Sequence, residues 1–312
     1  MSDMARVGFI GLGMMGKSMS QRVLAAGYPL TVYDIRPEPV EALVKAGAKK
    51  AANAREIADS SDIVLTSLPT LAACEETYFG TNGLLKGARK GMIFVETSTV
   101  TPDTVKRYAS EAGKLGAVVV DAAMLARTTF HPGLDKFKAD EIVAQGLVTV
   151  MIGGEVADVE RVRPVLATFG NPLFHVGPLG SGEMIKVLNN ATSHAYFVVV
   201  LEVLSVAAAH GVDLKKLEEI FRNTSAASCA MNDVAPHFLK NGKGKLMNIG
   251  AAIKDADAML EIARQVDVPV LMQNINHAYY EMAIQKSGSK DGSGDGELMK
   301  LFEGFIRKPL RF

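Results

Sequence analysis

The chain has 312 residues, and its 34 Lys and Arg residues balance 34 Asp and Glu residues. This length exceeds the size at which one hydrophobic core usually keeps growing, so two domains are expected. The charge balance excludes the sequence-independent attraction that nucleic acid or an anionic membrane would need, which leaves a small molecule or a second copy of the chain as partner.

Cysteine and histidine usage argues against a metalloprotein. Cys74 and Cys229 are the only cysteines, too few for a disulfide framework or a thiolate zinc site. The histidines show no HExxH or comparable spacing. The sequence passes from Met1 almost directly into VGFIGLG, unlike a secretory signal. We therefore expect a cytoplasmic protein without a metal.

The first part of the chain alternates between two kinds of segment. Strands are predicted at VGFI, LTVY, DIVLTS, GMIFVE, AVVVD, LVTVMI and PLFHV, and helices at MGKSMSQRVLAAG, PEPVEALVKAG, TPDTVKRYASEAGKLG and EVADVERVRPVLATFG. Strand, helix and strand in succession predict parallel pairing. We therefore predict an α/β fold whose first domain, residues 1–176, is a Rossmann-type doubly wound sheet.

The strand pattern fades after Gly182, and helical spacing takes over. A long helix is predicted to about His210, followed by helices at DLKKLEEIFR, DADAMLEIARQ and VLMQNINHAYYEMAIQ, with KSGSKDGSGDGE as a short flexible linker. The second domain, residues 177–312, is thus expected to be all helical and joined to the first by a long interdomain helix.

The longest apolar tract, AYFVVVLEVLSVAAAHGV from Ala195, lies in that long helix and is interrupted by Glu202. This interruption favours a buried helix over a membrane span. The tract is apolar nearly all round, more than one small helical domain can easily bury. We expect a homodimer or a homotetramer, and the sequence does not choose between them.

Three glycines in VGFIGLGMMGKSMSQRVLAAG lie where a predicted strand turns into a helix. Gly11 permits a tight turn, Gly13 allows the backbone to approach a pyrophosphate, and Gly16 allows the helix and strand to pack closely. The phosphates would then lie at the positive N-terminus of the helix. Because GxGxxG alone is a weak motif, a glycine-rich turn without a ligand stays possible until other features are considered.

Asp34 ends the second predicted strand, where a carboxylate can accept hydrogen bonds from an adenosine ribose. This favours NAD, because the 2′-phosphate of NADP would meet a like charge. Arg36 leaves NADP open, since its guanidinium could bind that phosphate if Asp34 turned aside. Alternatively, Asp34 is only a cap for the helix that begins near Pro37.

Two further turns are expected at the ligand-binding edge of the sheet. Leu68 and Pro69 follow one predicted strand, and Thr97, Ser98 and Thr99 follow the next. In doubly wound sheets this edge binds ligands. Taken singly, each turn is more often ordinary turn chemistry than a ligand contact.

Lys186 and Asn190 in GPLGSGEMIKVLNN are i and i+4 neighbours at the start of the long helix, so their side chains project from one face. A lysine at the ligand-binding edge can donate or accept a proton if burial and a cofactor's positive ring lower its pKa. The alternative is a solvated lysine beside a capping amide.

This order of parts resembles the β-hydroxyacid dehydrogenase family, which includes 3-hydroxyisobutyrate dehydrogenases and tartronate semialdehyde reductases. GFIGLGMMG is similar to the family's cofactor fingerprint, SLP to its adenine-side turn, ETSTVTP to its nicotinamide-side turn, GPLGSGEMIKVLNN to its catalytic helix and IKDADAML to its Lys-Asp motif. The resemblance covers nearly the whole chain.

The resemblance implies a role for each matching position. Lys186 would be the general acid and base, Asn190 would hold the substrate, and Lys254 would close over the cofactor, although a solvated Lys254 is equally open. His194 is expected to be a core or interface residue. The cofactor-binding residues would be Gly11, Leu12, Gly13, Met14, Met15, Gly16, Asp34, Ile35, Arg36, Leu68, Pro69, Ala73, Ser98, Thr99 and Lys254.

One segment departs from the family pattern. Where the family has D-A-P-V-S-G-G, whose serine and glycines hold the substrate carboxylate, this chain runs from Asp121 through Met124, Leu125 and Ala126 to Arg127 and continues into a longer connection. Leu125 has no polar side-chain atom, and Ala126 and Arg127 lack the conformational freedom of glycine. We expect Met124 and Arg127 to line a rebuilt substrate pocket, with Arg127 gripping an anion. A plain surface excursion at 130–142 stays open.

The leading interpretation is an NAD-dependent oxidoreductase that interconverts a short-chain 3-hydroxy acid and its semialdehyde. An alternative enzyme would reduce a different carbonyl or an imine, because the altered pocket need not hold a carboxylate. A third possibility is a dinucleotide-binding scaffold that has lost the reaction, although the retained Lys186 argues against it. A decarboxylating sugar-phosphate relative is disfavoured, since the chain adds no basic cluster for a phosphate.

Overall fold

The computed structural model describes residues 4–126, 139–241, 249–287 and 296–311. The described chain divides into two compact units, one ending at Lys186 and the other beginning at Val187. The division falls inside helix α8 (Ser181–Ala209), later than the boundary predicted between residues 176 and 177. Each unit has its own core and is described by itself.

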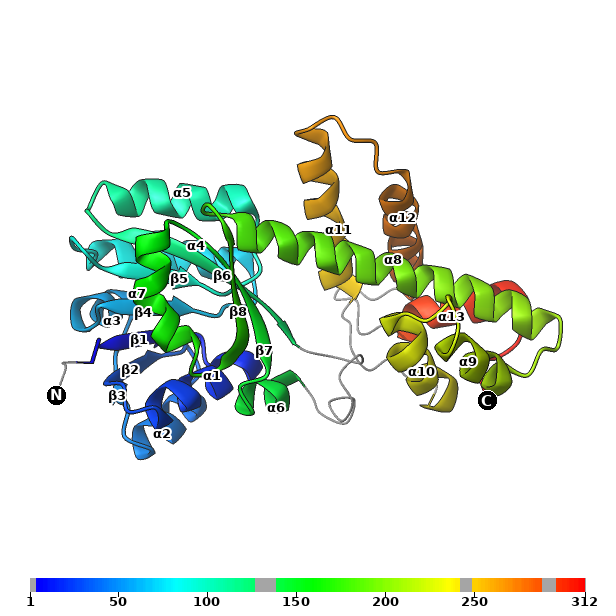
Figure 1. Cartoon of the computed structure of the whole chain (residues 1–312), viewed down its shortest axis with the longest axis horizontal. Helices are drawn as coiled ribbons and strands as arrows, with labels where there is room; N and C mark the ends of the chain where they lie inside the picture. The colour runs from blue at the N-terminus through cyan, green and yellow to red at the C-terminus, as the bar shows by residue number, and fades with distance from the viewer. Residues whose placement is uncertain (1–3, 127–138, 242–248, 288–295, 312) are drawn as a thin grey trace. The chain divides into compact units, whose positions relative to one another are not determined.

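The first unit is built on one sheet with the strand order β3-β2-β1-β4-β5-β6-β7-β8 (Figure 1). Every neighbouring pair of strands is parallel except β6 and β7, which pair antiparallel from Asp121↔Gly153 to Ala126↔Val148. The strands are β1 (Val7–Ile10), β2 (Leu30–Tyr33), β3 (Lys49–Lys50), β4 (Ile63–Thr66), β5 (Ile93–Glu96), β6 (Val118–Ala126), β7 (Val148–Gly153) and β8 (Gly170–Gly177).

The antiparallel pair corrects the expectation of parallel pairing throughout. An apolar, β-branched run predicts a strand but carries no information about its direction, and an antiparallel neighbour needs no full crossover. The seven predicted strands all form, and the two-residue strand β3 is an addition at one edge of the sheet.

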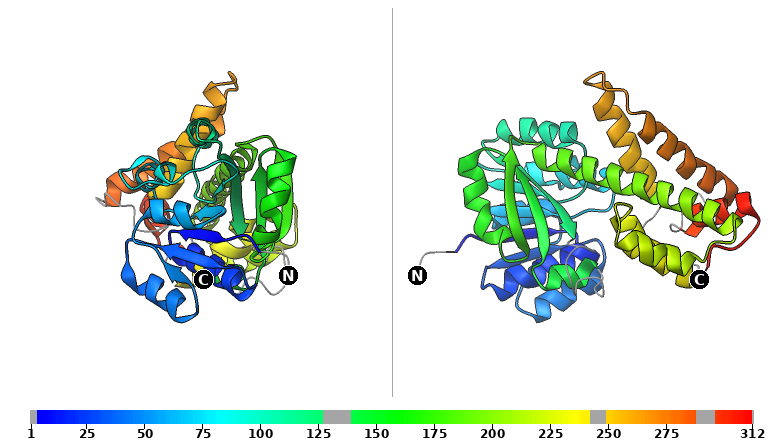
Figure 2. Two further views of the ribbon diagram at one scale, coloured as in Figure 1. Left: turned by 90° about the vertical axis from the view of Figure 1, so that its left-hand side faces the viewer. Right: turned by 45° about the vertical axis from the view of Figure 1, so that its right-hand side comes forward.

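Helices cover both faces of this sheet (Figure 2). Successive side chains of a strand point to opposite faces, and β4 is an example: Ile63 and Leu65 pack in one core cluster and Val64 in the other. The first cluster takes side chains from α1 (Met14–Ala25), α2 (Pro37–Lys45), α6 (Ala139–Ala144) and α7 (Val156–Leu166); the second takes them from α3 (Ala54–Ser60), α4 (Leu71–Phe79), η1 (Leu84–Lys86) and α5 (Pro102–Gly113).

Among its described residues, the second unit contains helices joined by turns and irregular segments, and no strand. Its core joins Phe197, Leu201 and Leu204 of α8 to apolar side chains of every later helix, including the fully buried Tyr280. The later helices are α9 (Leu214–Arg222), the π-helical turn η2 (Ala230–Val234), α10 (Ala235–Asn241), α11 (Ile249–Arg264), α12 (Leu271–Ser287) and α13 (Gly296–Ile306).

Helix α8 is long and apolar enough to cross a membrane by length and composition, and no other helix of the described residues is. However, Phe197, Leu201 and Leu204 each expose 4% or less of their surface in the core of the second unit. A core helix of a globular domain packs in this way. The length and apolar composition of α8 are therefore weak evidence for a membrane span.

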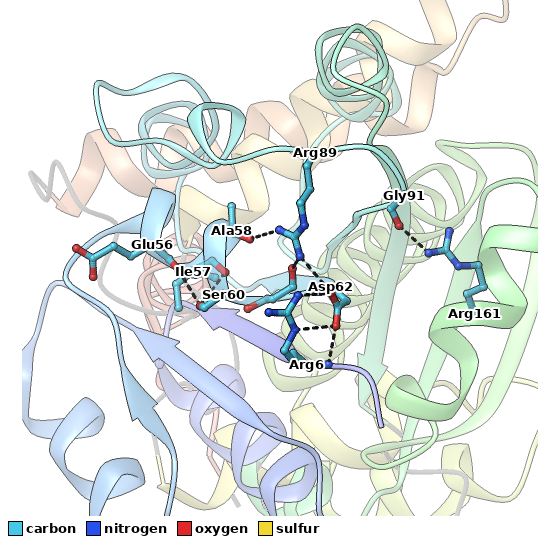
Figure 3. A network of polar contacts seen from close by, with 10 residues as sticks. Arg6, Glu56, Ile57, Ala58, Ser60, Asp62, Arg89, Gly91 and Arg161 are labelled. Carbon is cyan, nitrogen blue, oxygen red and sulfur yellow. Dashed lines mark hydrogen bonds and ion pairs between the residues drawn. The ribbon is translucent and has the colours of Figure 1, made fainter. Parts of the chain in front are cut away.

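An ionic cluster closes the amino-terminal edge of the sheet (Figure 3). Asp62, just before β4, accepts hydrogen bonds from the backbone and guanidinium of Arg6, just before β1, and it also pairs with Arg89. Hydrogen bonding to Arg6 lowers the pKa of Asp62 to about 2. The cluster ties β1 and β4 together at the edge opposite the glycine-rich turn, which leaves the carboxyl-terminal edge for a ligand.

Candidate functional site

The three glycines between β1 and α1 meet different surroundings. A Cβ atom on Gly11 would lie 2.2 Å from the Ser67 carbonyl oxygen, and the residue has φ +89°. A Cβ atom on Gly16 would lie 1.9 Å from the Gly11 carbonyl oxygen, whereas one on Gly13 would meet nothing within 4 Å. Gly11 and Gly16 are therefore required by packing within the chain, and Gly13 faces open space that a ligand can fill.

Helix α1 begins beside that space. Gly13 is its N-cap, no side chain caps the helix, and its first turn holds no acidic residue. The free N–H groups and the helix dipole give this end a partial positive charge that suits a pyrophosphate. The surroundings thus fit a dinucleotide cofactor.

A cavity of about 930 Å³ opens at the carboxyl ends of β1, β2 and β4. Ten of the residues predicted to bind the cofactor line it: Gly11, Gly13, Met14, Met15, Asp34, Ile35, Arg36, Leu68, Pro69 and Ala73. Its volume lies at the upper end of the range for ligand pockets, roughly 300–1,000 Å³. The cavity is large enough for an extended ligand.

Asp34 is held at the end of β2 by two sets of donors. Its Oδ2 accepts a hydrogen bond from the Leu12 amide at 2.6 Å, and its Oδ1 accepts from the Arg36 amide at 2.8 Å and from Arg36 Nε at 3.1 Å. Burial raises the pKa of Asp34, but the bonds from Arg36 and Leu12 outweigh it and the pKa is lowered. The carboxylate is thus ionised and partly shielded by its own arginine.

The remaining predicted cofactor residues lie elsewhere. Leu12 and Gly16 are buried in the turn, and Ser98 supports the cavity wall, because its Oγ accepts a hydrogen bond from the Leu68 amide at 2.8 Å. Thr99 follows Ser98 in the loop after β5. Lys254 lies on α11 in the second unit, where it pairs with Asp255 at 3.6 Å.

Part of the cavity wall was not predicted: Ile10, Tyr33, Ala52, Asn53, Ala54, Ser67, Glu76, Thr77, Thr81 and Asn82. Ile10, Tyr33 and Ser67 adjoin predicted positions, so strand ends alone could have indicated them. The others come from the start of α3 and from α4 and its following turn. Those segments contain no recognisable motif, so their contribution to the cavity could not be predicted from the sequence.

Lys186 extends from the second turn of α8 to strand β6. Its Nζ donates a hydrogen bond to the backbone oxygen of Met124 at 2.8 Å, and it is partly buried there. The side chain of Met124 packs in the core with 8% of its surface exposed. Met124 therefore meets Lys186 through its backbone.

Asn190 follows one turn later on α8, within the second unit. Its Nδ2 donates to Asp255 Oδ2 on α11 at 2.8 Å, and its Oδ1 accepts from Asn189 at 3.2 Å. Because an ionised carboxylate only accepts, this contact fixes which end of the amide faces Asp255. Asp255 was not singled out in the sequence, although it adjoins Lys254 in the Lys-Asp motif.

The segment that departs from the family pattern is described only in its first part. Residues 121–126 form the end of β6 and pair with β7 in an unbroken register. Arg127 and the connection that follows it to residue 138 lie outside the described residues. The proposed grip of Arg127 on an anion therefore stays a prediction.

Comparison with known proteins places the chain in a family. Residues 6–125 match the model of the NAD binding domain of 6-phosphogluconate dehydrogenase, and residues 180–301 match the model described as NAD-binding of NADP-dependent 3-hydroxyisobutyrate dehydrogenase. The chain is 30% identical over 301 residues to a probable mitochondrial 3-hydroxyisobutyrate dehydrogenase of Dictyostelium discoideum, covering 94% of this chain and 90% of that protein. The chain belongs to the β-hydroxyacid dehydrogenase family.

Two further similarities fit this family. An NAD-dependent L-serine dehydrogenase of Pseudomonas aeruginosa is 32% identical over 233 residues, 75% of this chain and 74% of that one. The solved structure of Mycobacterium tuberculosis 3-hydroxyisobutyrate dehydrogenase with L-serine has a TM-score of 0.78 and 20% identity, covering 96% of this chain and 99% of that one. The predicted family and the Rossmann-type fold are confirmed, and the chain is an NAD-dependent oxidoreductase.

Two alanine substitutions separate the packing role of the glycine turn from its ligand role. We expect Gly16→Ala to destabilise the first unit by about 1–3 kcal/mol, because its Cβ has no room. We expect Gly13→Ala to leave the melting temperature close to wild type but to weaken NADH binding by roughly tenfold or more, because its Cβ enters the pyrophosphate space. Thermal unfolding and fluorescence titration with NADH measure the two effects. Equal NADH affinity in Gly13→Ala and wild type would contradict this assignment.

Proposed function

We propose that the chain is an NAD-dependent dehydrogenase that interconverts a short 3-hydroxy acid and its semialdehyde. Relatives are named for 3-hydroxyisobutyrate, L-serine and 2-(hydroxymethyl)glutarate. These three compounds share a primary alcohol on the carbon next to the α-carbon of a carboxylate. The observation that carries the proposal is a partly buried lysine, Lys186, held against the Met124 carbonyl beside the first turns of α8.

Lys186 would move the proton of the reaction. In the oxidation direction the hydroxyl proton passes to the neutral Lys186 amine while hydride leaves the same carbon, and a carbonyl group forms. Bound NAD supplies the hydride acceptor. In the reverse direction the Lys186 ammonium protonates the carbonyl oxygen. The Met124 carbonyl can hold either form of Lys186 in place, because the amine and the ammonium both donate hydrogen bonds.

Asn190 would orient the substrate from the following turn of α8. Asp255 accepts a hydrogen bond from Asn190 Nδ2, which directs Asn190 Oδ1 away from Asp255. Oδ1 accepts one bond from Asn189, and its second lone pair can accept from a donor such as a substrate hydroxyl. Lys254 beside Asp255 would contribute positive charge near the cofactor. Arg127 would take the place of the family's serine and glycines in binding the substrate carboxylate.

Asp34 and Arg36 would together set the preference for NAD. With Arg36 on its carboxylate, Asp34 keeps a negative charge at the end of β2 that repels a 2′-phosphate. Ribose hydroxyls could replace Arg36 as donors to Asp34. Arg36, released from the pair, would be the group that accommodates NADP.

The chain would work as a homo-oligomer that buries one face of α8. Tyr196, Val199, Val203 and Val206 recur at spacings of three and four residues, and between 36% and 62% of each is exposed. This stripe is the kind of apolar surface that a second copy covers.

Replacement of the proposed acid and base tests the reaction. We expect Lys186→Ala to lower kcat/KM by roughly 10²–10⁴-fold, the usual contribution of general acid–base catalysis, with NADH affinity retained. Initial rates would be measured with 3-hydroxyisobutyrate, L-serine and 2-(hydroxymethyl)glutarate, with a cyclic imine as the competing substrate class. NADH binding without turnover of any hydroxy acid by the wild type would overturn the proposal, and turnover of the imine alone would favour the reductase alternative.

Substitutions at the end of β2 test cofactor choice. We expect Asp34→Asn to lower kcat/KM for NAD by roughly 10–100-fold, the value of one charge-assisted hydrogen bond of about 1.5–3 kcal/mol. We expect Arg36→Ala to lower kcat/KM for NADP more than for NAD. Steady-state rates with both cofactors give the ratio, and an unchanged ratio in both variants would remove these residues from cofactor selection.

A charge on the exposed α8 stripe tests the assembly. We expect Val199→Asp to lower the molar mass measured by light scattering after size-exclusion chromatography, because burying a charge in an apolar interface is costly. Gln285→Asp, at an exposed position of α12, is the matched control. A monomeric wild type would show that the stripe has another use.

A further inference from the structure

Three carboxyl groups lie inside the first unit with no exposed surface. Glu96 ends β5, Asp121 lies on β6, and Glu183 lies in the first turn of α8. They are close enough that Glu96 and Asp121 both disfavour the charged form of Glu183. Buried carboxylates normally have a positive partner or a full set of donors. This group therefore needs a physical explanation.

The donors around the three groups are unequal. Asp121 accepts from the Gly180 amide at 2.7 Å and from the Glu183 amide at 2.9 Å, so both of its oxygens are satisfied. Glu96 Oε1 accepts from the Ser98 amide at 2.8 Å, and Glu183 Oε2 accepts from the Val100 amide at 3.2 Å.

The second oxygens of Glu96 and Glu183 are buried with no hydrogen-bond partner. Thr66 and Tyr78 lie near Glu96, but neither hydroxyl makes a hydrogen bond of normal geometry to that oxygen. Two ionised oxygens in this position would be costly, whereas a protonated carboxyl group supplies one donor and needs one acceptor. A proton on each glutamate would therefore remove a buried charge that has no partner.

The other titratable groups around Glu96 and Glu183 do not supply enough positive charge to neutralise two ionised glutamates. Burial raises the pKa of Glu96 to about 7 and that of the Cys74 thiol to about 12, and it raises the pKa of Glu183 well above its usual range. The facing groups are Cys74 and Tyr78 from α4, Tyr108 from α5, Asp121 from β6 and Lys186 from α8. Among them only Lys186 brings positive charge.

Glu96 is linked through hydrogen bonds to the wall of the cofactor cavity, and Glu183 lies close to Lys186 on α8. Glu96 holds the Ser98 amide, and the Ser98 hydroxyl accepts from the amide of Leu68, which lines the cofactor cavity. Glu183 precedes Lys186 by three residues on α8, one turn of helix away. Movement of these glutamates would thus reach the cavity wall and the proposed acid and base.

We propose that Glu96 and Glu183 are held protonated inside the first unit and act as positioning residues for the active site. With their protons present, the two side chains hold residues 98–100 against the first turn of α8. Without them, two buried negative charges repel each other and loosen both the Leu68 wall and the Lys186 turn. This inference deepens the proposed function, but cofactor binding and unfolding can test it without any substrate.

The sign of the pH dependence follows from the raised pKa values. A carboxyl group with a raised pKa in the folded state contributes stability below its ordinary pKa, and that stability is lost as the pH rises through the folded value. For Glu96 the loss is complete slightly above about pH 7, and Glu183 adds a further loss as the pH rises through its own raised pKa. Melting temperature and NADH affinity are therefore expected to fall together on the alkaline side.

The test compares Glu96→Gln and Glu183→Gln with wild type between about pH 6 and about pH 9. Each glutamine keeps the oxygen that accepts the loop amide and removes one negative charge. We expect each variant to lose the part of the decline in melting temperature and in NADH affinity that its own glutamate contributes, so the decline with rising pH becomes shallower in both, by up to about tenfold per pH unit in the unfolding equilibrium constant. Glu41→Gln, an exposed glutamate on α2, is the matched control and should follow wild type.

Three outcomes would overturn the proposal. The first is a decline with rising pH that is as steep in both glutamine variants as in wild type. The second is a shallower decline in melting temperature without a shallower decline in NADH affinity, which would make the pair purely structural. If a variant does not fold, the infrared carboxylic acid band of the wild type decides, and its absence at about pH 6 would exclude protonated glutamates. If the pH effects on melting temperature and NADH affinity are observed but the wild type turns over no hydroxy acid, the proposed reaction is contradicted. The positioning role of Glu96 and Glu183 is then still supported.

Discussion

The carboxylate of Asp121 anchors the start of α8 to strand β6. It accepts from the Gly180 and Glu183 amides, which lie at a helix N-terminus where negative charge is favoured. The space around it depends on two glycines, because a Cβ on Gly153 or Gly182 would lie within 2.8 Å of its oxygens. Burial raises the pKa of Asp121 and the amide donors oppose this. This contact fixes the first turn of α8, which precedes Lys186, against strand β6.

The cofactor end and the chemical end of the first unit are built on different kinds of contact. The cofactor end is a turn of close backbone approaches, where Gly11 and Gly16 leave no room for a side chain and Gly13 faces open space. The chemical end is a set of buried charges and amides around Asp121 and Glu183. Backbone packing is insensitive to pH, whereas buried charges are not, so pH should act on this site mainly through α8 and β5.

The sequence predicted features that depend on local chemistry. The turn at Gly11–Gly16, the strand ends and the long α8 follow from residue spacing within one segment. Short helices such as α3 and α6 lack enough residues for a period to be recognised. The antiparallel β6–β7 pair and the contact of Asn190 with Asp255 depend on segments brought together only by folding. The burial of Glu96 and Glu183 in one region has the same origin, since no spacing marks two glutamates that lie 87 residues apart in the sequence.

The structure explains how this chain can keep Lys186 while it departs from the family at the neighbouring positions. Lys186 bonds to the backbone oxygen of Met124, and a backbone oxygen is present whatever side chain that position carries. Strand β6 also stays paired with β7 through Ala126. Substitutions along this strand can therefore alter the side chains next to a substrate without moving the lysine. On such a scaffold the substrate preference would be free to change while Lys186, the proposed proton-transferring group, is retained.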